Sequence, residues 1–300
     1  MRNGSGPRGV GWELGGRSDA HAHTHLSDGL ASPAEVVREA TALGLARIAI
    51  TDHDCIDAHR DRSWLAVCAE PCPEVVAGVE IDCSLLDLEV EVLGYEFDPH
   101  APVLVESLAR IQRERQARFR FYCEGLVRSG ESLDPEGVLA LPARAPMKVH
   151  LFRALQERGR RFPGGYAEFK RLLAFLGEPP PLHRPTAAEA VRWVGDAGGL
   201  TLLAHPLYYA RRLGWPAVLQ AARDAGCVGV EGAYPYDVGD AGCAPDEIER
   251  ELRAMRDALR GIFPDGPYLS SGTDVHDLAD WEMRLTRVAH WRRVVGLPSA

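Results

Sequence analysis

Several features that define whole classes of protein are missing from this sequence of 300 residues. It has no run of about 18 apolar residues, the length that a membrane-spanning helix needs. Its first 19 residues lack the apolar stretch of about 7–15 residues that marks a secretory signal peptide. Cys-x-x-Cys is absent, and the seven cysteines cannot all pair with one another. We therefore expect a reduced, cytoplasmic protein that makes no contact with a membrane.

Two common catalytic motifs are also missing. The chain has no Gly-x-Ser-x-Gly turn and no Gly-rich Walker loop, which argues against serine hydrolases and P-loop enzymes. No internal repeat is present at a period of roughly 20–50 residues. The composition, with 46% hydrophobic and 26% charged residues, is close to the globular average and excludes a disordered or fibrous chain.

Charge is distributed unevenly along the chain. The net charge of −9 argues against broad binding of duplex nucleic acid. Residues 101–190 contain 15 Lys and Arg against 10 Asp and Glu, whereas the remainder contains 19 against 33. A basic segment is therefore set into an acidic body, and the acidic residues are either a solvated surface or a source of carboxylates for metal ions.

The order of predicted elements favours an α/β fold. Capping boxes at Ser32–Glu35 and Thr186–Glu189 mark the starts of two helices. The predicted strands are residues 18–22, 46–51, 74–81, 88–97, 200–204, 227–232 and 268–271, and the predicted helices between them are 33–43, 59–69, 187 onward, 215–225 and 245–260. Repeating β–α units of this kind predict a parallel sheet or a barrel.

Two segments interrupt this alternation. Residues 1–17 are rich in glycine and are expected to form a flexible leader. Residues 101–185 are expected to be a helical insertion that caps the substrate, beginning with one long arginine-rich helix over residues 102–129 and ending in a proline-rich stretch. The remaining residues, 18–100 and 186–300, supply the strands of the barrel.

Imidazoles and carboxylates gather at the carboxyl ends of five predicted strands. The five segments are residues 19–29 (DAHAHTHLSDG), 51–54 (TDHD), 78–81 (GVEI), 204–206 (AHP) and 272–276 (GTDVH). In parallel α/β barrels this edge carries the active site. Residues i and i+2 of an extended chain point to the same side, so His21 and His23 can bind one metal ion together, as can Asp274 and His276. Such ligands suit Zn, Mn or Fe.

Each motif taken singly has a structural alternative. His-x-His pairs often bind nothing, the turn at 51–54 can simply close a strand, His205 can be a buried histidine, and residues 272–274 can be an ordinary turn. The occurrence of all five at one edge favours a metal site. The other histidines are expected on the surface or in loops: His25, His59, His100, His183 and His290.

The ordered series HAHTHLSDG, TDHD, GVEI, AHP and GTDVH resembles the PHP (polymerase and histidinol phosphatase) superfamily of metal-dependent phosphoesterases. The position of the helical insertion, between GVEI and AHP, is similar to the subgroup of nucleoside 3′,5′-bisphosphate phosphatases and RNase AM-like 5′-3′ exoribonucleases. The resemblance implies an α/β fold in the form of a distorted, TIM-like β/α barrel. It also implies two or three divalent metal ions, most often Mn, with Zn or Fe as alternatives.

The resemblance further implies a set of ligands. His21, His23, Glu80 and Asp274 correspond to the ligands of one ion; Asp28, His53 and His276 to those of a second; and Glu80, His205 and Glu91 to those of a third. His53, Asp274 and His276 are the residues expected at the centre of catalysis. Family members usually have a histidine where this chain has Glu91. The alternative is that Glu91 faces solvent and that the site holds two ions.

Residues of the insertion are the candidates for substrate binding. Lys148, His150 and Arg153 resemble a phosphate-contacting segment of the subgroup, and Arg118 and Arg120 come from the arginine-rich helix, whose alternative role is a solvated basic face. The activity implied is hydrolysis of a phosphate ester, of a nucleotide or a short 5′-phosphorylated oligonucleotide, by a hydroxide that bridges two metal ions. The alternatives are a metal-dependent hydrolase of an amide or ester, and a PHP domain without catalytic activity.

Overall fold

Eight strands form one sheet in the order β1-β8-β7-β6-β5-β4-β3-β2 in the computed structural model, which describes residues 8–9, 17–68, 71–238 and 244–297. The strands are β1 (Arg8–Gly9), β2 (Ser18–Ala22), β3 (Arg47–Ile50), β4 (Glu74–Leu85), β5 (Leu88–Tyr95), β6 (Leu200–Leu203), β7 (Gly229–Ala233) and β8 (Tyr268–Ser271). An isolated bridge joins Ala22 to Val275, just beyond β8. The sheet therefore closes on itself as a barrel.

One hairpin distorts this barrel. Strand β5 runs antiparallel to both β4 and β6, whereas the other neighbouring strands are parallel. The sequence predicted a parallel sheet or a barrel; the barrel is confirmed, but its strands are not all parallel. The reason is the connection: Leu86 and Asp87, with φ of 50° and 59°, turn the chain directly from β4 into β5 and leave no room for a crossover helix. The fold is the expected distorted β/α barrel.

The predicted leader lies mostly outside the described residues. Arg8 and Gly9 are described, and they pair in parallel with Tyr268 and Leu269 of β8. The flexibility of the leader over residues 1–17 stays a prediction.

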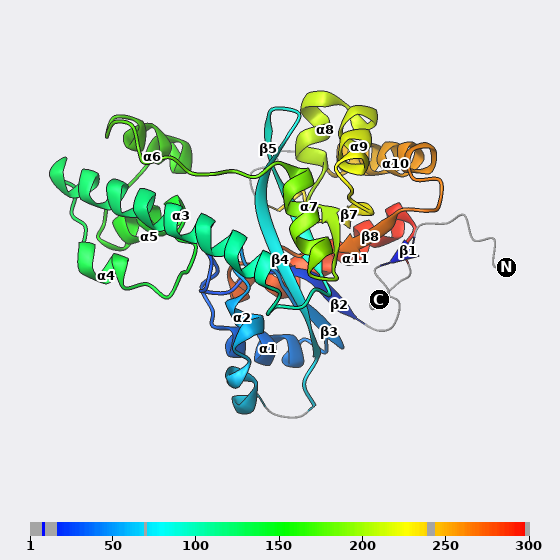
Figure 1. Cartoon of the computed structure of the whole chain (residues 1–300), viewed down its shortest axis with the longest axis horizontal. Coiled ribbons are helices and arrows are strands. Elements are labelled where there is room, and N and C mark those ends of the chain that lie inside the picture. Colours follow the sequence, from blue (N-terminus) through cyan, green and yellow to red (C-terminus); the bar gives the residue numbers. More distant parts are fainter. Residues whose placement is uncertain (1–7, 10–16, 69–70, 239–243, 298–300) are drawn as a thin grey trace.

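Helices cover the outside of the barrel (Figure 1). They are α1 (Pro33–Ala42), α2 (Asp57–Arg60), α7 (Ala187–Asp196), α8 (Leu207–Leu213), α9 (Trp215–Asp224), α10 (Pro245–Ile262) and α11 (Trp281–Val295). Both predicted capping boxes are present, at Ser32 and Thr186. The single helix predicted over 59–69 is wrong. The backbone becomes extended at Asp61, whose side chain accepts from the Ser63 amide and starts a separate 3-10 turn, Ser63–Val67.

Alternation along the strands separates the interior of the barrel from its outer layer. Ile48 and Ile50 pack outward against α1, while Ala49 between them joins Leu93 and Tyr95 in a separate apolar cluster. The Tyr95 hydroxyl donates to the carbonyl of Ala20 over 2.9 Å. Side chains two residues apart in a strand share a face. Glu80 therefore lies on the same face of β4 as Val76, and Glu91 lies on the same face of β5 as Leu93. The barrel interior is thus apolar below and acidic at its mouth.

Four helices follow β5 and extend to one side of the barrel, drawn in green in Figure 1. They are α3 (Pro102–Arg128), α4 (Pro135–Leu139), α5 (Lys148–Glu157) and α6 (Gly165–Ala174). They enclose a core of their own that includes Phe119, Leu151 and Phe169. The chain returns beside β4, where the Ser84 amide donates to the carbonyl of Pro185 over 2.8 Å. Their role as a cap over substrate stays a prediction. No helix in the described residues is both long and apolar enough to cross a membrane.

Candidate metal centre

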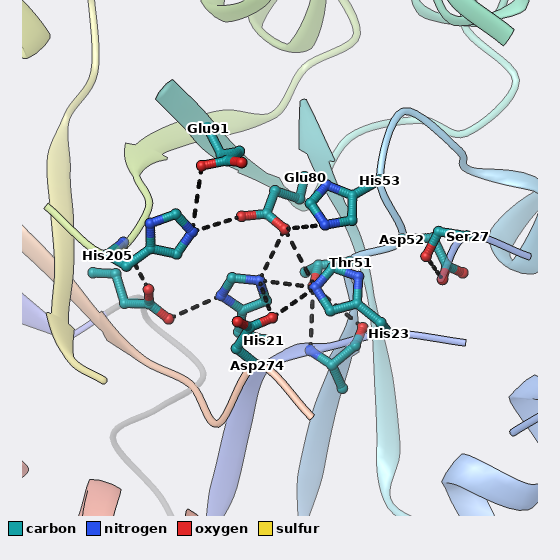
Figure 2. Close-up of polar contacts among 12 residues, drawn as sticks. His21, His23, Ser27, Thr51, Asp52, His53, Glu80, Glu91, His205 and Asp274 are labelled. Atoms are coloured by element: carbon teal, nitrogen blue, oxygen red, sulfur yellow. Dashed lines mark hydrogen bonds and ion pairs between the residues drawn. The ribbon is translucent and has the colours of Figure 1, made fainter. Parts of the chain in front are cut away.

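The nine residues predicted as metal ligands converge at the mouth of the barrel. They form three adjacent groups, in each of which one donor atom per residue lies within 4.8 Å of the others. The groups are His21, His23, Glu80 and Asp274; His23, Asp28, His53 and His276; and Glu80, Glu91 and His205. His23 and Glu80 are shared between groups, so the three form one continuous site. Figure 2 shows Glu80 at its centre, with imidazoles on either side.

The first group is the most buried. Nε2 of His21 lies 3.1 Å from Oε2 of Glu80 and 3.4 Å from Oδ1 of Asp274, and Nε2 of His23 lies 3.0 Å from the same Asp274 oxygen. Both imidazoles are fully buried. Gly272 makes this close packing possible, because a Cβ atom there would lie 2.2 Å from Cβ of His21. Two nitrogens and two carboxylate oxygens therefore face one small space.

The second group contains two buried polar atoms that make no hydrogen bond. Nδ1 of His23 and Oδ1 of Asp28 are buried and have no hydrogen bond. Nε2 of His276 lies 3.1 Å from that Asp28 oxygen, and Nε2 of His53 lies 3.9 Å from it. Buried polar atoms that lack a hydrogen bond cost free energy, and a bound cation would satisfy both of these atoms. This donor set of imidazole nitrogens and carboxylate oxygens, without a thiolate, fits Mn, Fe or Zn.

The third group depends on the residue that departs from the family pattern. Nε2 of His205 lies 3.1 Å from Oε1 of Glu80 and 3.6 Å from Oε2 of Glu91. The hydroxyl group of Tyr209 donates to the same Glu91 oxygen over 2.7 Å. The Glu91 carboxylate therefore points into the site. The alternative considered from the sequence was that it faces solvent. Its role as a ligand stays a prediction.

The backbone is strained where it presents these side chains. Asp54, His205 and Asp274 have φ of 47°, 25° and 52°, in the left-handed region that residues with a Cβ atom rarely adopt. Strain of this kind is typical of functional sites, where the surrounding structure holds it in place. At Asp274 the restraint is visible, because its amide donates to the carbonyl of His21 over 2.8 Å.

A second layer of buried carboxylates holds the donors in position. Glu231 is on β7. Its Oε1 lies 3.0 Å from Nδ1 of His21, and its Oε2 accepts a hydrogen bond from the His205 amide over 2.8 Å. Asp52 accepts from the Thr24 amide over 2.7 Å and from the Ser27 hydroxyl over 2.6 Å, which fixes the loop that carries Asp28. Histidine ligands of metals commonly have such a partner on the other ring nitrogen.

Several of these supporting residues were not found from the sequence. Asp19 and Asp52 lie in two of the predicted segments but were given no role, and Glu231 and Tyr209 lie in none of them. A signal existed for Glu231, because it is the one charged residue in an otherwise apolar strand, and a buried charge requires a partner. His59, expected on the surface, is 3% exposed. Its Nε2–H donates to the carbonyl of Ile50 over 2.8 Å, so its role is structural.

Neighbouring charges displace the pKa values of several groups in the site. Burial alone lowers the pKa of His205, but the hydrogen bond with Glu80 and the charge of Glu91 raise it to about 9. Asp28 and Asp274 likewise raise the pKa of His276 to about 9 against the effect of burial. Although burial opposes it, His21 and His53 hold the pKa of Glu80 well below its usual range. Protons on the imidazoles thus balance the buried carboxylates.

The five predicted substrate-binding residues lie in three places. Lys148 and Arg118 line a cavity of about 300 Å³, together with Arg184 and Asp82. His150 and Arg153 line a second cavity, of about 430 Å³, on the other side of helix α5. Arg153 donates to the carbonyl of Asp28 over 2.6 Å. Arg120 is exposed and lines neither cavity, because it lies two residues beyond Arg118 and hence on another face of the helix.

Comparison with known proteins identifies the class. Residues 19–130 match the PHP domain family. The 5′-3′ exoribonuclease Rnm of Salmonella typhimurium is 33% identical over 206 residues, which cover 66% of this chain and 68% of that protein. The 3′,5′-nucleoside bisphosphate phosphatase of Chromobacterium violaceum is 28% identical over 263 residues, 86% of each chain. The protein belongs to the PHP domain family.

A solved structure shares the fold of this chain. An amidohydrolase from Chromobacterium violaceum, with bound sulfate and no metal, superposes with a TM-score of 0.64 at 26% sequence identity. The match covers 87% of this chain and 88% of the other. The match is therefore longer than the family match over residues 19–130.

Proposed function

We propose that this protein is a metal-dependent phosphoesterase that hydrolyses a phosphate ester of a nucleotide or of a short 5′-phosphorylated oligonucleotide. The observation that carries the proposal is the continuous set of three donor groups, sharing His23 and Glu80, at the mouth of a PHP-family barrel. It is a phosphoric ester hydrolase, as are relatives named exoribonuclease and bisphosphate phosphatase.

Two or three divalent ions are proposed, with Mn as the first choice and Zn or Fe as alternatives. His21, His23, Glu80 and Asp274 would hold one ion; Asp28, His53 and His276 a second; and Glu80, Glu91 and His205 a third. Bound there, the ions supply positive charge for the phosphoryl oxygens and activate water for attack on phosphorus. A carboxylate at position 91 makes the third group richer in oxygen, which favours Mn over Zn in relative terms.

Three side chains of the protein complete the site. His53, Asp274 and His276 stand at the rim, where they are less buried than His21 and His23. Asp274 is held by the Tyr234 hydroxyl, which donates to its Oδ2 over 2.8 Å, so that Oδ1 stays turned toward the two deep imidazoles. We assign the three rim residues to catalysis because a substrate entering from solvent meets them first.

The cavity at Lys148 is the proposed place for a second phosphate. Arg118, Lys148 and Arg184 line it, and Asp82 connects it to the metal groups. Positive groups around a small cavity attract phosphate and strengthen hydrogen bonds to it. A substrate with one phosphate at the metal centre and another nearby fits this arrangement. Nucleoside bisphosphates and 5′-phosphorylated oligonucleotides both have that chemistry.

We make two further assignments. We assign Arg153 to the support of the Asp28 loop, because it donates a hydrogen bond to the Asp28 carbonyl, and His150 to the wall of the second cavity.

We also propose that the protein is cytoplasmic. Cys55, Cys68, Cys83, Cys123 and Cys227 have free thiols, which agrees with a reducing compartment.

The test is a panel of phosphoesters offered to protein loaded in turn with Mn, Fe and Zn. It includes nucleoside 3′,5′-bisphosphates, nucleoside monophosphates, 5′-phosphorylated oligoribonucleotides and duplex RNA, with an amide and a carboxylic ester as outside controls. We expect phosphate or mononucleotide release from a substrate bearing two phosphates and none from intact duplex. Turnover of the amide or ester alone would overturn the proposal, as would a metal-loaded protein inert toward every phosphoester.

The cavity is tested with matched variants of helix α3. Arg118→Met should raise KM for the preferred substrate by about tenfold or more, since a charged hydrogen bond to phosphate is lost. Arg113→Met, an exposed position on the same helix, is the control and should leave KM unchanged. Equal effects of the two substitutions on KM would show that the cavity is not part of the substrate-binding site.

A further inference from the structure

One arginine of helix α3 is turned away from solvent toward the barrel. Arg115 is 8% exposed, and its guanidinium group lies between two carboxylates. Its Nε donates to Oδ2 of Asp54 over 2.8 Å, and its Nη2 donates to Oδ2 of Asp82 over 2.5 Å. A buried charge costs free energy unless it is paired and hydrogen-bonded, so a guanidinium buried between two acids needs both of them. It makes a fixed connection between α3 and strand β4.

The connection continues to a proposed metal ligand. The other oxygen of Asp82, Oδ1, lies 3.1 Å from Nδ1 of His53. A carboxylate can only accept, so Nδ1 carries the proton and donates it. Nε2 of His53 is then the ring nitrogen turned toward the metal groups, 3.3 Å from Oε2 of Glu80. Which nitrogen of a histidine is free for a metal is set by the hydrogen bond of the other nitrogen.

The turn that follows His53 is held from the same helix. Asp54 has φ of 47°, and Gln112 of α3 donates to its carbonyl over 2.9 Å. The Asp54 amide donates to the carbonyl of Glu80, and its side chain accepts from the Asp82 amide over 3.2 Å. The strained turn therefore depends on one helix of the insertion and one strand of the barrel.

We propose that Arg115 is a positioning residue for the metal centre: acting through Asp82, it keeps Nε2 of His53 free and turned toward the second donor group, so that full metal affinity requires helix α3 in its docked position. The inference rests on the proposed function only in requiring that this group binds a metal ion. It assigns Arg115 no contact with substrate.

The sign of the change in metal affinity separates this role from a plain effect of charge. Removing a positive charge near a cation site should strengthen metal binding if charge alone matters. If Arg115 acts by positioning, Arg115→Met should instead weaken Mn binding, by about 10–100-fold for one ion, the range seen when a residue that orients a ligand is lost. Equilibrium dialysis against Mn, followed by elemental analysis, measures this without any substrate.

Three further variants complete the experiment. Asp82→Ser should weaken the same ion similarly, and Arg115→Met combined with Asp82→Ser should be no weaker than Asp82→Ser alone, because the two residues act in series. Arg115→Lys keeps the charge but lacks the planar fork that spans two carboxylates, so it should also bind Mn more weakly than wild type. Arg113→Met is the control and should bind as wild type does.

Each result bears on the proposal. Unchanged or tighter Mn binding by Arg115→Met, additive losses in the double variant, or wild-type affinity in Arg115→Lys would each overturn it. If Arg115→Met does not fold, Arg115→Lys and Asp82→Ser give the answer, since Asp82→Ser leaves the pair with Asp54 in place. A protein that binds Mn as expected but hydrolyses no phosphoester would contradict the proposed function and leave this inference standing.

Discussion

The hydroxyl group of Tyr209 lies 2.7 Å from Oε2 of Glu91, and the amide of Glu91 donates back to that hydroxyl over 3.0 Å. The two bonds fix both the side chain and the backbone of Glu91. Tyr209 also lies 3.3 Å from Nδ1 of His205, the neighbouring member of the third group. One tyrosine thus orients both residues that, with Glu80, complete this group.

Loss of that hydroxyl should weaken the third group alone. In Tyr209→Phe we expect the tightly bound metal to fall by one ion per chain, or the affinity of one ion to fall by about 10–100-fold. Elemental analysis after dialysis against Mn measures it. Glu91→Ala should produce the same loss. Unchanged stoichiometry in both variants would show that the site holds two ions.

Glu231 should couple two groups at once. It contacts His21 and the amide of His205, so Glu231→Gln loses one of two acceptors while keeping the volume of the side chain. We expect weaker binding of two ions, with thermal unfolding of the metal-free protein changed little. Asp19→Asn is the comparison, because Asp19 is as buried but bonds to the His21 backbone and to Thr273. A loss confined to one ion in Glu231→Gln would contradict the coupling.

Metal binding should release protons at neutral pH. His205 and His276 have pKa values raised to about 9, so both are mostly protonated near pH 7 and must lose a proton to bind a metal. The apparent Mn affinity should therefore rise with pH and level off above about 9. Calorimetry in buffers of different ionisation enthalpy counts the protons released. An affinity that does not change between about pH 7 and 9 would exclude these two residues as ligands.

The same shifts predict the stability of the metal-free protein. Because the folded-state pKa is raised above the unfolded value of about 6.5, the contribution of these histidines is complete below about pH 6.5 and is lost as pH rises through 9. The thermal midpoint of metal-free protein should decline across that window. Saturating Mn should reduce the decline, since metal replaces the protons.

Substitutions at the rim should abolish turnover without unfolding the chain. We expect His53→Ala and Asp274→Ala each to lower the catalytic rate by at least about a hundredfold, the low end for residues that act as a unit. Both sit at the mouth of the barrel and not in its apolar cluster. His290→Ala, at an exposed position on α11, is the control. Circular dichroism shows whether the variants are folded. Folded variants with near-native catalytic rates would refute the assignment.

The sequence predicted the site better than it predicted the sheet. Proposed ligands such as His21 and His23 can be predicted because residues two apart in a strand point to the same side. Strand β5 was predicted, but its direction was not, because the direction depends on the Leu86–Asp87 turn and Leu86 is not a usual residue of a tight hairpin. His59 was misplaced for a similar reason. Its burial depends on which backbone carbonyl lies nearby, and no local pattern records that.

The supporting residues were harder to predict than the donors. Arg115 belongs to a helix in which six arginines look alike in sequence, and only the tertiary contact with Asp54 and Asp82 distinguishes it. Tertiary structure also separates the substrate-binding candidates. Lys148 and Arg153 lie on different faces of helix α5, so this one helix lines two different cavities.

The helical insertion leaves the barrel after β5 and returns beside Ser84 of β4, so both of its ends lie on one hairpin. This arrangement resembles a replaceable module: a different insertion could be grafted at the same hairpin and change substrate preference while the donors of the barrel stay in place. The buried contact of Arg115 sets a condition on such grafts. A chimaera that brings new helices without a guanidinium for Asp54 and Asp82 should inherit the barrel and lose its metal, which makes that single arginine the first residue to transplant.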